Sequence, residues 1–149
     1  FYPFIAVPFF ILAGDLMNEG GLSKRITDFA NALLGHRRGG LALVTTASAP
    51  MFGAVSGASS ATCAAIGRLM IPAMEKEGYP RAFGAALAAC SGITGALIPP
   101  SIMLLIYGTI ASVSIEKLFL AGVMPGLLIG IALALVSWRY ATRHALPVR

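Results

Sequence analysis

Long apolar stretches alternate with short polar gaps along the chain. The apolar stretches occupy residues 1–18, 41–74, 82–113 and 119–138, and the gaps hold most of the charged residues. A helix that crosses a bilayer needs about 20 consecutive, mostly apolar residues. The pattern therefore predicts an all-α integral membrane protein with several membrane segments, in which 1–18 and 119–138 are simple transmembrane helices.

Residues 19–40 follow a different pattern. From Leu22 to Leu34 the apolar residues recur at helical spacing, and polar residues occupy the rest of the helix surface. A helix of this kind between two membrane segments is expected to lie along the bilayer surface as an amphipathic arm. The basic run His36-Arg37-Arg38 that follows the helix predicts that this region is cytoplasmic.

The segment 41–74 is unusually rich in small residues. Between Leu41 and Gly67, 18 of 27 residues are Ala, Ser, Thr or Gly. Its 34 residues are many for one crossing and few for two crossings joined by a loop. We expect a re-entrant helical hairpin with its tip at Ser56–Ser60. Two full crossings are the alternative, and the positions of the charged loops do not distinguish the two, because both place these loops on the same sides of the membrane.

The segment 82–113 is interrupted by Pro99-Pro100. Each proline removes a backbone donor and disfavours a helical conformation in the residue before it. The sequence predicts a discontinuous span, with one half-helix ending near Ala96 and a second beginning at Pro100. The loop 75–81 and the basic segment 139–149 are then both cytoplasmic, as the positive-inside rule requires.

Three glycines of the last apolar segment form a stripe. Gly122, Gly126 and Gly130 are four residues apart and share one helix face. Small residues at this spacing allow close contact between membrane helices. We expect the stripe to pack against a neighbouring helix.

Composition excludes several classes of protein. Hydrophobic residues make up 57% of the 149-residue chain and charged residues 11%, against roughly 25% charged residues in soluble domains. So few charged residues could not cover a water-exposed surface, which excludes an ordinary soluble enzyme. A nucleic-acid-binding domain is also excluded, because the basic residues behind the net charge of +5 are dispersed among the polar gaps. The chain opens on Phe1 without an initiator Met, and we expect it to be a fragment of a longer protein that resides in a lipid bilayer.

The two predicted helix breaks carry the candidate chemistry. The half-helices that start at Ser59-Ser60 and at Pro100-Ser101 would place two positive helix N-termini near the middle of the membrane, where they suit an anion. The half-helices that end there leave backbone carbonyls unpaired, and carbonyl and serine oxygens suit a small cation such as sodium. For any single serine, simple packing between helices is the favoured interpretation, whereas the two breaks taken together favour a functional role.

Arg68 is the only charged residue within the predicted hairpin. A charge at membrane depth is a functional candidate. An arginine can also extend its side chain toward the cytoplasmic interface and serve no further role. The sequence leaves both interpretations open.

Three blocks of sequence resemble one transporter family. The run FFILAGDLMNEGGLSKRITDFANALLGHRRGGLALV, the run MFGAVSGASSATCAAIGRLMIPAMEKEGY and the run GALIPPSIMLLIYG are similar to the large membrane subunit of tripartite ATP-independent periplasmic (TRAP) transporters. The resemblance covers essentially the whole chain. It implies an elevator-type, sodium-driven importer of organic acids such as C4-dicarboxylates, keto acids or sialic acid. It also implies a small membrane subunit, an extracytoplasmic substrate-binding protein and a place in the bacterial inner membrane.

The resemblance also assigns site residues. The residues that it implies for the sodium site are Ser56, Gly57, Ala58, Ser59, Thr94, Gly95 and Pro99. The residues that it implies for the wall of the substrate site are Ser59, Ser60, Pro100 and Ser101. Ala58 departs from the family pattern, in which Ser is common, and Asp15 replaces a usual Glu. The second inverted repeat of the family is absent from this chain, so we do not expect the chain to transport alone.

Two other classes of function have weaker support. The run Gly53-Ala54-Val55-Ser56-Gly57 resembles the surroundings of a nucleophilic serine, as in an intramembrane protease, but such a serine needs a base within hydrogen-bond reach. Both histidines, His36 and His144, lie in polar flanks. A channel or another elevator-type ion transporter is the third hypothesis. A second hairpin-and-broken-span repeat in the flanking sequence would favour an elevator, and its absence would count against one.

Overall fold

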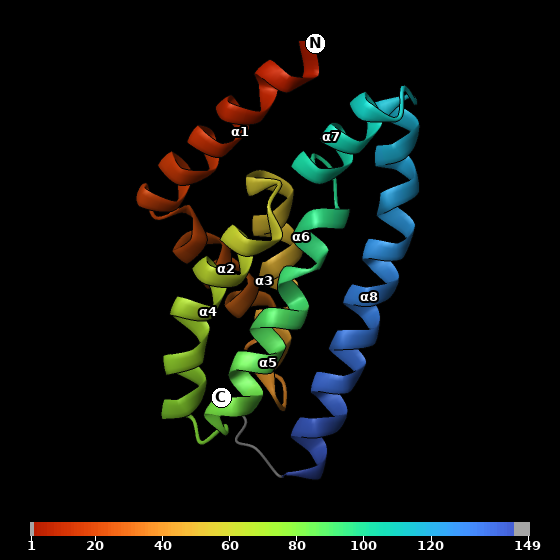
Figure 1. Ribbon diagram of the computed structural model, residues 1–149. Coiled ribbons are helices and arrows are strands. Elements are labelled where there is room, and N and C mark those ends of the chain that lie inside the picture. The colour runs from red at the N-terminus through yellow and green to blue at the C-terminus, as the bar shows by residue number, and fades with distance from the viewer. Residues whose placement is uncertain (1, 145–149) are drawn as a thin grey trace.

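The computed structural model describes residues 2–144 as a bundle of helices with no strand in that range (Figure 1). The helices are α1 (Tyr2–Glu19), α2 (Leu22–Leu34), α3 (Gly40–Ser56), α4 (Ser59–Lys76), α5 (Arg81–Gly92), α6 (Thr94–Leu97), α7 (Ile102–Ile110) and α8 (Ile115–Arg143). The chain is therefore all-α, as its hydrophobic pattern predicts.

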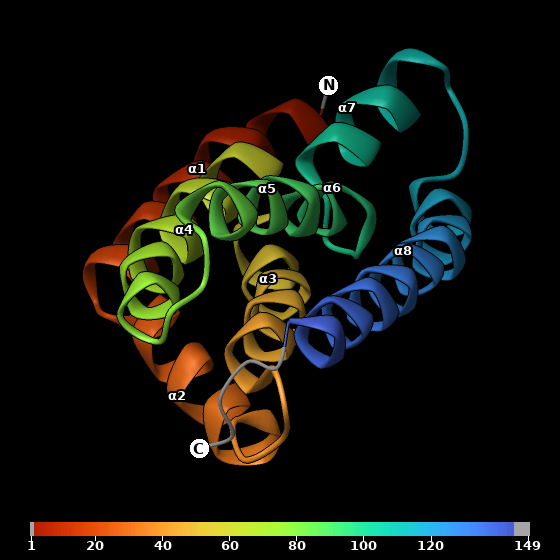
Figure 2. The same ribbon diagram turned by 90° about the horizontal axis from the view of Figure 1, so that it is seen from below.

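Helix α3 lies at the centre of the bundle. Viewed along the bundle, α4 and α8 lie on opposite sides of α3, α5 runs along a third side between them, and α2 packs beside α3 (Figure 2). The core is formed by side chains of α3, α4 and α5, and Phe52, Ile66 and Met70 are its largest fully buried members. Burying such side chains stabilises the fold by roughly 1.5–3 kcal/mol each.

The small-residue segment forms two antiparallel helices joined by a two-residue break. Helix α3 ends at Ser56, Gly57 adopts a left-handed conformation with a φ of 66°, and Ala58 is extended before α4 begins at Ser59. Left-handed backbone favours glycine because a side chain there would be strained. The helical hairpin has its tip in the range that the sequence indicates, and its placement within the bilayer stays a prediction.

The second break lies at the two prolines. Helix α6 ends at Leu97, α7 begins at Ile102, and the two halves differ in direction by 44°. The Pro99–Pro100 peptide bond is cis. The prediction that the second half-helix begins at Pro100 is wrong by two residues. Ser101 is the N-cap, and its hydroxyl accepts a hydrogen bond from the Leu104 backbone N–H at 3.3 Å, which fixes the helix start one residue beyond the serine.

Helix α8 is longer than the predicted segment 119–138. Its first turn includes Glu116 and Lys117, and Ser114 caps it by accepting a hydrogen bond from the Lys117 N–H. Among the described residues, α8 alone is long and apolar enough to cross a membrane by itself, and up to three spans result if each bent helix pair counts as one. The remaining membrane segments stay predictions.

The glycine stripe on α8 contacts the broken helix at two of its three positions. A Cβ on Gly122 would lie 2.6 Å from the Leu97 carbonyl oxygen, and a Cβ on Gly126 would lie 3.0 Å from Ile98. Gly130, by contrast, has open space where its Cβ would be. The expectation that the whole stripe packs on a neighbour is therefore wrong at Gly130, because α8 and α3 leave a cavity there.

Helix α2 presents apolar side chains in two directions. Ala30 is buried against the core, whereas Phe29 and Leu33, one turn apart, are more than half exposed. The helix occupies the range of the amphipathic pattern. Its position along the bilayer surface remains a prediction.

Stacked aromatic rings join the end of α8 to the loop between α4 and α5. The rings of Phe83 and Tyr140 stack with centroids 3.8 Å apart, Tyr79 stacks on Phe83, and His144 stacks on Tyr140. Tyr79 is 4% exposed although it lies in a polar loop. Burial raises the pKa of Tyr79 above its usual value of 10.0, the charge of Glu77 raises it further, and the Ala42 backbone lowers it in part.

The raised pKa of Tyr79 predicts a loss of stability at alkaline pH. The tyrosine ionises near pH 10 in the unfolded chain and only at higher pH in the folded protein, so its contribution is complete below pH 10 and is lost as pH rises through the folded pKa. Thermal unfolding of the full-length protein, followed against pH, should show this decline for the wild type. Tyr79→Phe should flatten that part of the profile, and the exposed Tyr107→Phe should leave it unchanged.

Candidate functional site: two helix breaks that meet

The two helix breaks touch each other directly. The backbone N–H of Ile102, the first residue of α7, donates a hydrogen bond of 3.0 Å to the carbonyl oxygen of Gly57 at the hairpin tip. A Cβ on Gly57 would lie 2.9 Å from the carbonyl oxygen of Pro100. Gly57 and Pro100, which are both predicted site residues, are thus brought together. Glycine at position 57 permits both the left-handed turn and the close approach.

A network of hydroxyl and carbonyl oxygens forms at the hairpin tip. The Ser56 hydroxyl lies 3.1 Å from that of Thr62, and both are fully or almost fully buried. The Thr62 hydroxyl donates to the Ala58 carbonyl oxygen at 2.8 Å, and the Ser56 hydroxyl approaches the same oxygen at 3.4 Å. Ala58 therefore joins this network through its backbone carbonyl group. The presence of Ala rather than Ser at position 58 does not change this contact.

The hairpin and the broken helix approach each other through paired glycines. A Cβ on Gly53 would overlap the Cα atom of Gly95, and a Cβ on Gly95 would lie 2.6 Å from the Thr62 hydroxyl. Next to Gly95, the buried Thr94 hydroxyl donates to the Ser91 carbonyl oxygen at 2.6 Å. The close contact places polar atoms of α3, α4 and α6 within one small region.

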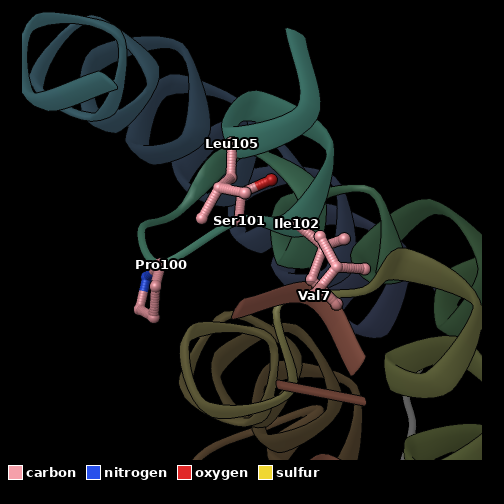
Figure 3. Close-up of a pocket in the computed structure, with 5 residues that line it drawn as sticks. All are labelled: Val7, Pro100, Ser101, Ile102 and Leu105. Carbon is pink, nitrogen blue, oxygen red and sulfur yellow. The ribbon is translucent and has the colours of Figure 1, made fainter. Parts of the chain in front are cut away.

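Ser101 and Pro100 form the wall of the second break. The Ser101 hydroxyl donates to the Ala96 carbonyl oxygen at 2.6 Å across the break. Ile102 lies beside Val7 of α1, with Pro100 at the turn of the chain (Figure 3). The depression lined by these residues has no room for a water molecule. Pro99 lies in the same extended stretch and is partly buried.

The two helix N-termini differ in how their N–H groups are used. At α7 the N–H groups of Ile102 and Leu104 already donate to Gly57 and Ser101. At α4 the N-cap residue is Ala58, which supplies no side-chain cap. Ser59 and Ser60 form the first turn of α4, with Ser60 exposed. An anion would therefore find uncapped N–H groups at α4 rather than at α7.

Sequence reasoning missed several residues of this region. Thr62 is not among the predicted site residues, although its hydroxyl group, four residues after the break at Ala58, is a signal for it in the sequence. The hydroxyl groups of Ser48 and Ser91 are completely buried and have no hydrogen-bond partner among the described residues. Gly14 of α1 packs on the tip, since a Cβ there would lie 3.5 Å from the Cα of Ser56.

The donor atoms at the breaks are neutral oxygens. Within residues 2–144 no group of three or more His, Cys, Asp or Glu side chains could hold a metal ion. Hydroxyl and carbonyl oxygens are hard ligands without a net charge, which suits a weakly held alkali cation better than a transition metal. Within the described residues, the Ser56 hydroxyl contacts oxygen atoms of Thr62 and Ala58, neither of which is the base that a nucleophilic serine needs.

Comparison with known proteins shows the family of this chain. Residues 2–149 match the family model described as "Tripartite ATP-independent periplasmic transporter, DctM component". The chain belongs to the DctM family. Members of this family are transporter permeases and not enzymes.

Named relatives of the DctM family are similar over almost all of this chain. The C4-dicarboxylate TRAP transporter large permease protein DctM of Pseudomonas aeruginosa is 47% identical over 146 residues, which are 98% of this chain and 34% of the relative. The isethionate permease DctMQ of Oleidesulfovibrio alaskensis is 47% identical over 96% of this chain and 22% of the relative. The sialic acid permease SiaT of Haemophilus influenzae is 44% identical over 98% and 24%. The chain thus spans about a third or less of the length of these relatives.

Arg68 of this DctM-family chain faces the junction of α1 and α2. Its side chain is exposed and lines a cavity of about 250 Å³ together with Asn18, Glu19 and Ser23. The cavity is separate from the two breaks. Arg68 therefore lies outside the candidate site.

The hydrogen bond between the two breaks gives a specific prediction. Ile102→Pro removes the backbone N–H that donates this hydrogen bond, while the first position of α7 tolerates proline. Leaving the buried Gly57 carbonyl oxygen without its donor costs about 1–3 kcal/mol, so we expect uptake by the full-length permease to fall about tenfold. Ile102→Val keeps the donor and should transport like the wild type. Equal uptake by both variants would show that the hydrogen bond is dispensable.

Proposed function

We propose that this chain forms one half of the ion and substrate site in the permease of a sodium-coupled TRAP transporter that imports organic acids. The single observation that carries the proposal is the hydrogen bond from Ile102 to Gly57, which joins two helix interruptions. Interrupted helices that meet at mid-depth supply both helix N-termini and free carbonyl groups to a ligand, as in other secondary transporters. The names of the relatives support the class of substrate.

The sodium ion is assigned to the oxygen network of the hairpin tip and the adjoining break. Ser56 and the backbone of Gly57, Ala58 and Ser59 provide one side, and Thr94, Gly95 and Pro99 provide the other. The burial of Ser56 and Thr94 and the hydrogen bonds that orient their hydroxyl groups support this assignment. Small shifts of these groups would open a coordination shell of hydroxyl and carbonyl oxygens.

The substrate is assigned to the side of Ser59, Ser60, Pro100 and Ser101. A carboxylate or sulfonate bound at the start of α4 would gain from its uncapped N–H groups and from the positive end of the helix dipole. The depression at Pro100 and Ser101 is too small for an organic acid on its own. The rest of the permease supplies the opposite wall in this proposal.

The complete machine includes other chains. We place the permease in the bacterial inner membrane as a multi-pass protein, with a small membrane subunit and an extracytoplasmic binding protein that delivers the acid. The amphipathic α2 serves as an arm along the membrane surface. The permease works by an elevator-type cycle.

Uptake into proteoliposomes tests this function. The full-length permease is reconstituted with its small subunit and binding protein, and labelled C4-dicarboxylate, sialic acid, isethionate and a keto acid are supplied with an inward sodium gradient or an equal potassium gradient. We expect accumulation of one of these acids in sodium only. Accumulation that is the same in both gradients would refute sodium coupling, and accumulation of none would refute the proposed substrate class.

A further inference from the structure

A cavity lies between α3 and α8. Near one end Gly126 of α8 packs on Ile98 in the break after α6, and near the other the hydroxyl groups of Thr46 of α3 and Ser137 of α8 lie 3.3 Å apart. Between these contacts Gly130 faces open space. The cavity has a volume of about 400 Å³, within the range of about 300–1,000 Å³ that ligand sites occupy.

The lining of the cavity is apolar along most of its length. Leu43 and Pro50 of α3 face Leu127 and Ala134 of α8 across it. The α8 positions from 126 to 134 extend over about 12 Å, because a helix rises 1.5 Å per residue. An apolar space of this length suits an extended hydrocarbon chain better than a compact, charged organic acid.

One end of the cavity is strongly basic. Arg37 lines the cavity itself, and Arg38 follows it on the exposed loop before α3. Gly39 of the same loop packs on Ala141, so the loop lies against the turn of α8 between Arg139 and Arg143. None of these arginines forms an ion pair within the described part of the chain. Unpaired arginines at the end of an apolar helix attract the anionic headgroups of lipids.

We propose that this cavity binds an anionic phospholipid, with one acyl chain between α3 and α8 and the phosphate against Arg37 and Arg38. The apolar lining determines where the acyl chain lies, and the basic end determines where the headgroup of the lipid lies. Arginine binds phosphate through charge-assisted hydrogen bonds, often two at once. The site is separate from the helix breaks and does not depend on the substrate or on sodium.

Lipid retention by the full-length permease tests the proposal. The permease is purified with its small subunit, exchanged into nanodiscs of phosphatidylcholine containing a tenth of phosphatidylglycerol, and the phosphatidylglycerol that it retains is measured by native mass spectrometry. Arg37→Gln/Arg38→Gln should weaken retention roughly thirtyfold, the effect of two basic residues near an anionic lipid. Lys117→Gln, at the other end of α8, is the charge control and should have no effect.

A second pair of variants tests the place of the acyl chain. Gly130→Leu places a large side chain in the cavity, where nothing lies within 4 Å of the Cβ position. It should abolish retention of phosphatidylglycerol while the melting temperature is kept. Ala132→Leu introduces a leucine at an exposed position of α8 and should retain the lipid. The proposal is overturned if the wild type retains no more phosphatidylglycerol than Gly130→Leu does. It is also overturned if the melting temperature falls only for Gly130→Leu, because protein would then already fill the cavity in the full-length permease.

Discussion

Gly53→Ala is expected to abolish transport by the full-length permease. The added methyl group would overlap the Cα of Gly95 and approach its backbone nitrogen at 3.0 Å, so the two backbones must separate. Overpacking a core costs about 1–3 kcal/mol where side chains can yield, and more is expected where backbone meets backbone. The separation would also disturb Thr62, which lies beside Gly95. Thermal unfolding and substrate uptake, both on the full-length protein, measure the two effects.

Gly130→Ala is the matched control for this substitution. It makes the same chemical change in a helix, and its Cβ meets nothing within 4 Å. Alanine is the better helix former by about 1 kcal/mol, so the control should unfold at the same temperature as the wild type or slightly above it. If Gly53→Ala unfolded at the same temperature as Gly130→Ala and transported substrate equally well, the hairpin and the broken helix would not be in close contact.

Ser56→Ala is expected to raise the sodium concentration needed for half-maximal uptake by about tenfold or more. The substitution removes a buried hydroxyl that the proposal assigns to sodium, and oxygen contacts to a charge are worth roughly 1.5–3 kcal/mol. Thr62→Val removes the group that orients the Ser56 hydroxyl and the Ala58 carbonyl oxygen, and should act in the same direction. Because the two hydroxyl groups are in contact, the double variant should show less than the sum of both effects.

Ser137→Ala is the control for the loss of a buried hydroxyl. Ser137 is completely buried and pairs with the Thr46 hydroxyl at 3.3 Å, but it lies on α8 away from the breaks. Its removal should leave the sodium dependence unchanged even if stability falls slightly. A sodium dependence that shifts equally for Ser56→Ala and Ser137→Ala would contradict a specific role for the hairpin tip.

The helix breaks could be predicted from the sequence because local backbone chemistry determines them. Two adjacent prolines interrupt a helix wherever they occur, and Gly57 permits the left-handed turn. The start of α7 could not be read with the same precision. Both Pro100 and Ser101 suit the beginning of a helix, and only the hydrogen bond from Leu104 to Ser101 decides between them.

Contacts between distant segments could not be predicted from the pattern alone. The spacing of Gly122, Gly126 and Gly130 shows that they share a helix face, but it does not show that the neighbouring helix diverges before Gly130. Likewise, Glu116 and Lys117 suit a loop as well as the first turn of a capped helix. Thr62 gains its place in the oxygen network only because α4 folds back beside α3.

The movement of sodium together with the acid tests the central proposal most directly. Entry of radioactive sodium and of the labelled acid is measured in the same proteoliposomes, for the wild-type permease with its partners and for Ser56→Ala/Thr62→Val. We expect sodium to enter with the acid in the wild type, and both fluxes to fall sharply in the double variant at low sodium. Acid uptake without sodium entry, or equal sodium entry in both proteins, would contradict an ion site at the meeting of the two helix breaks.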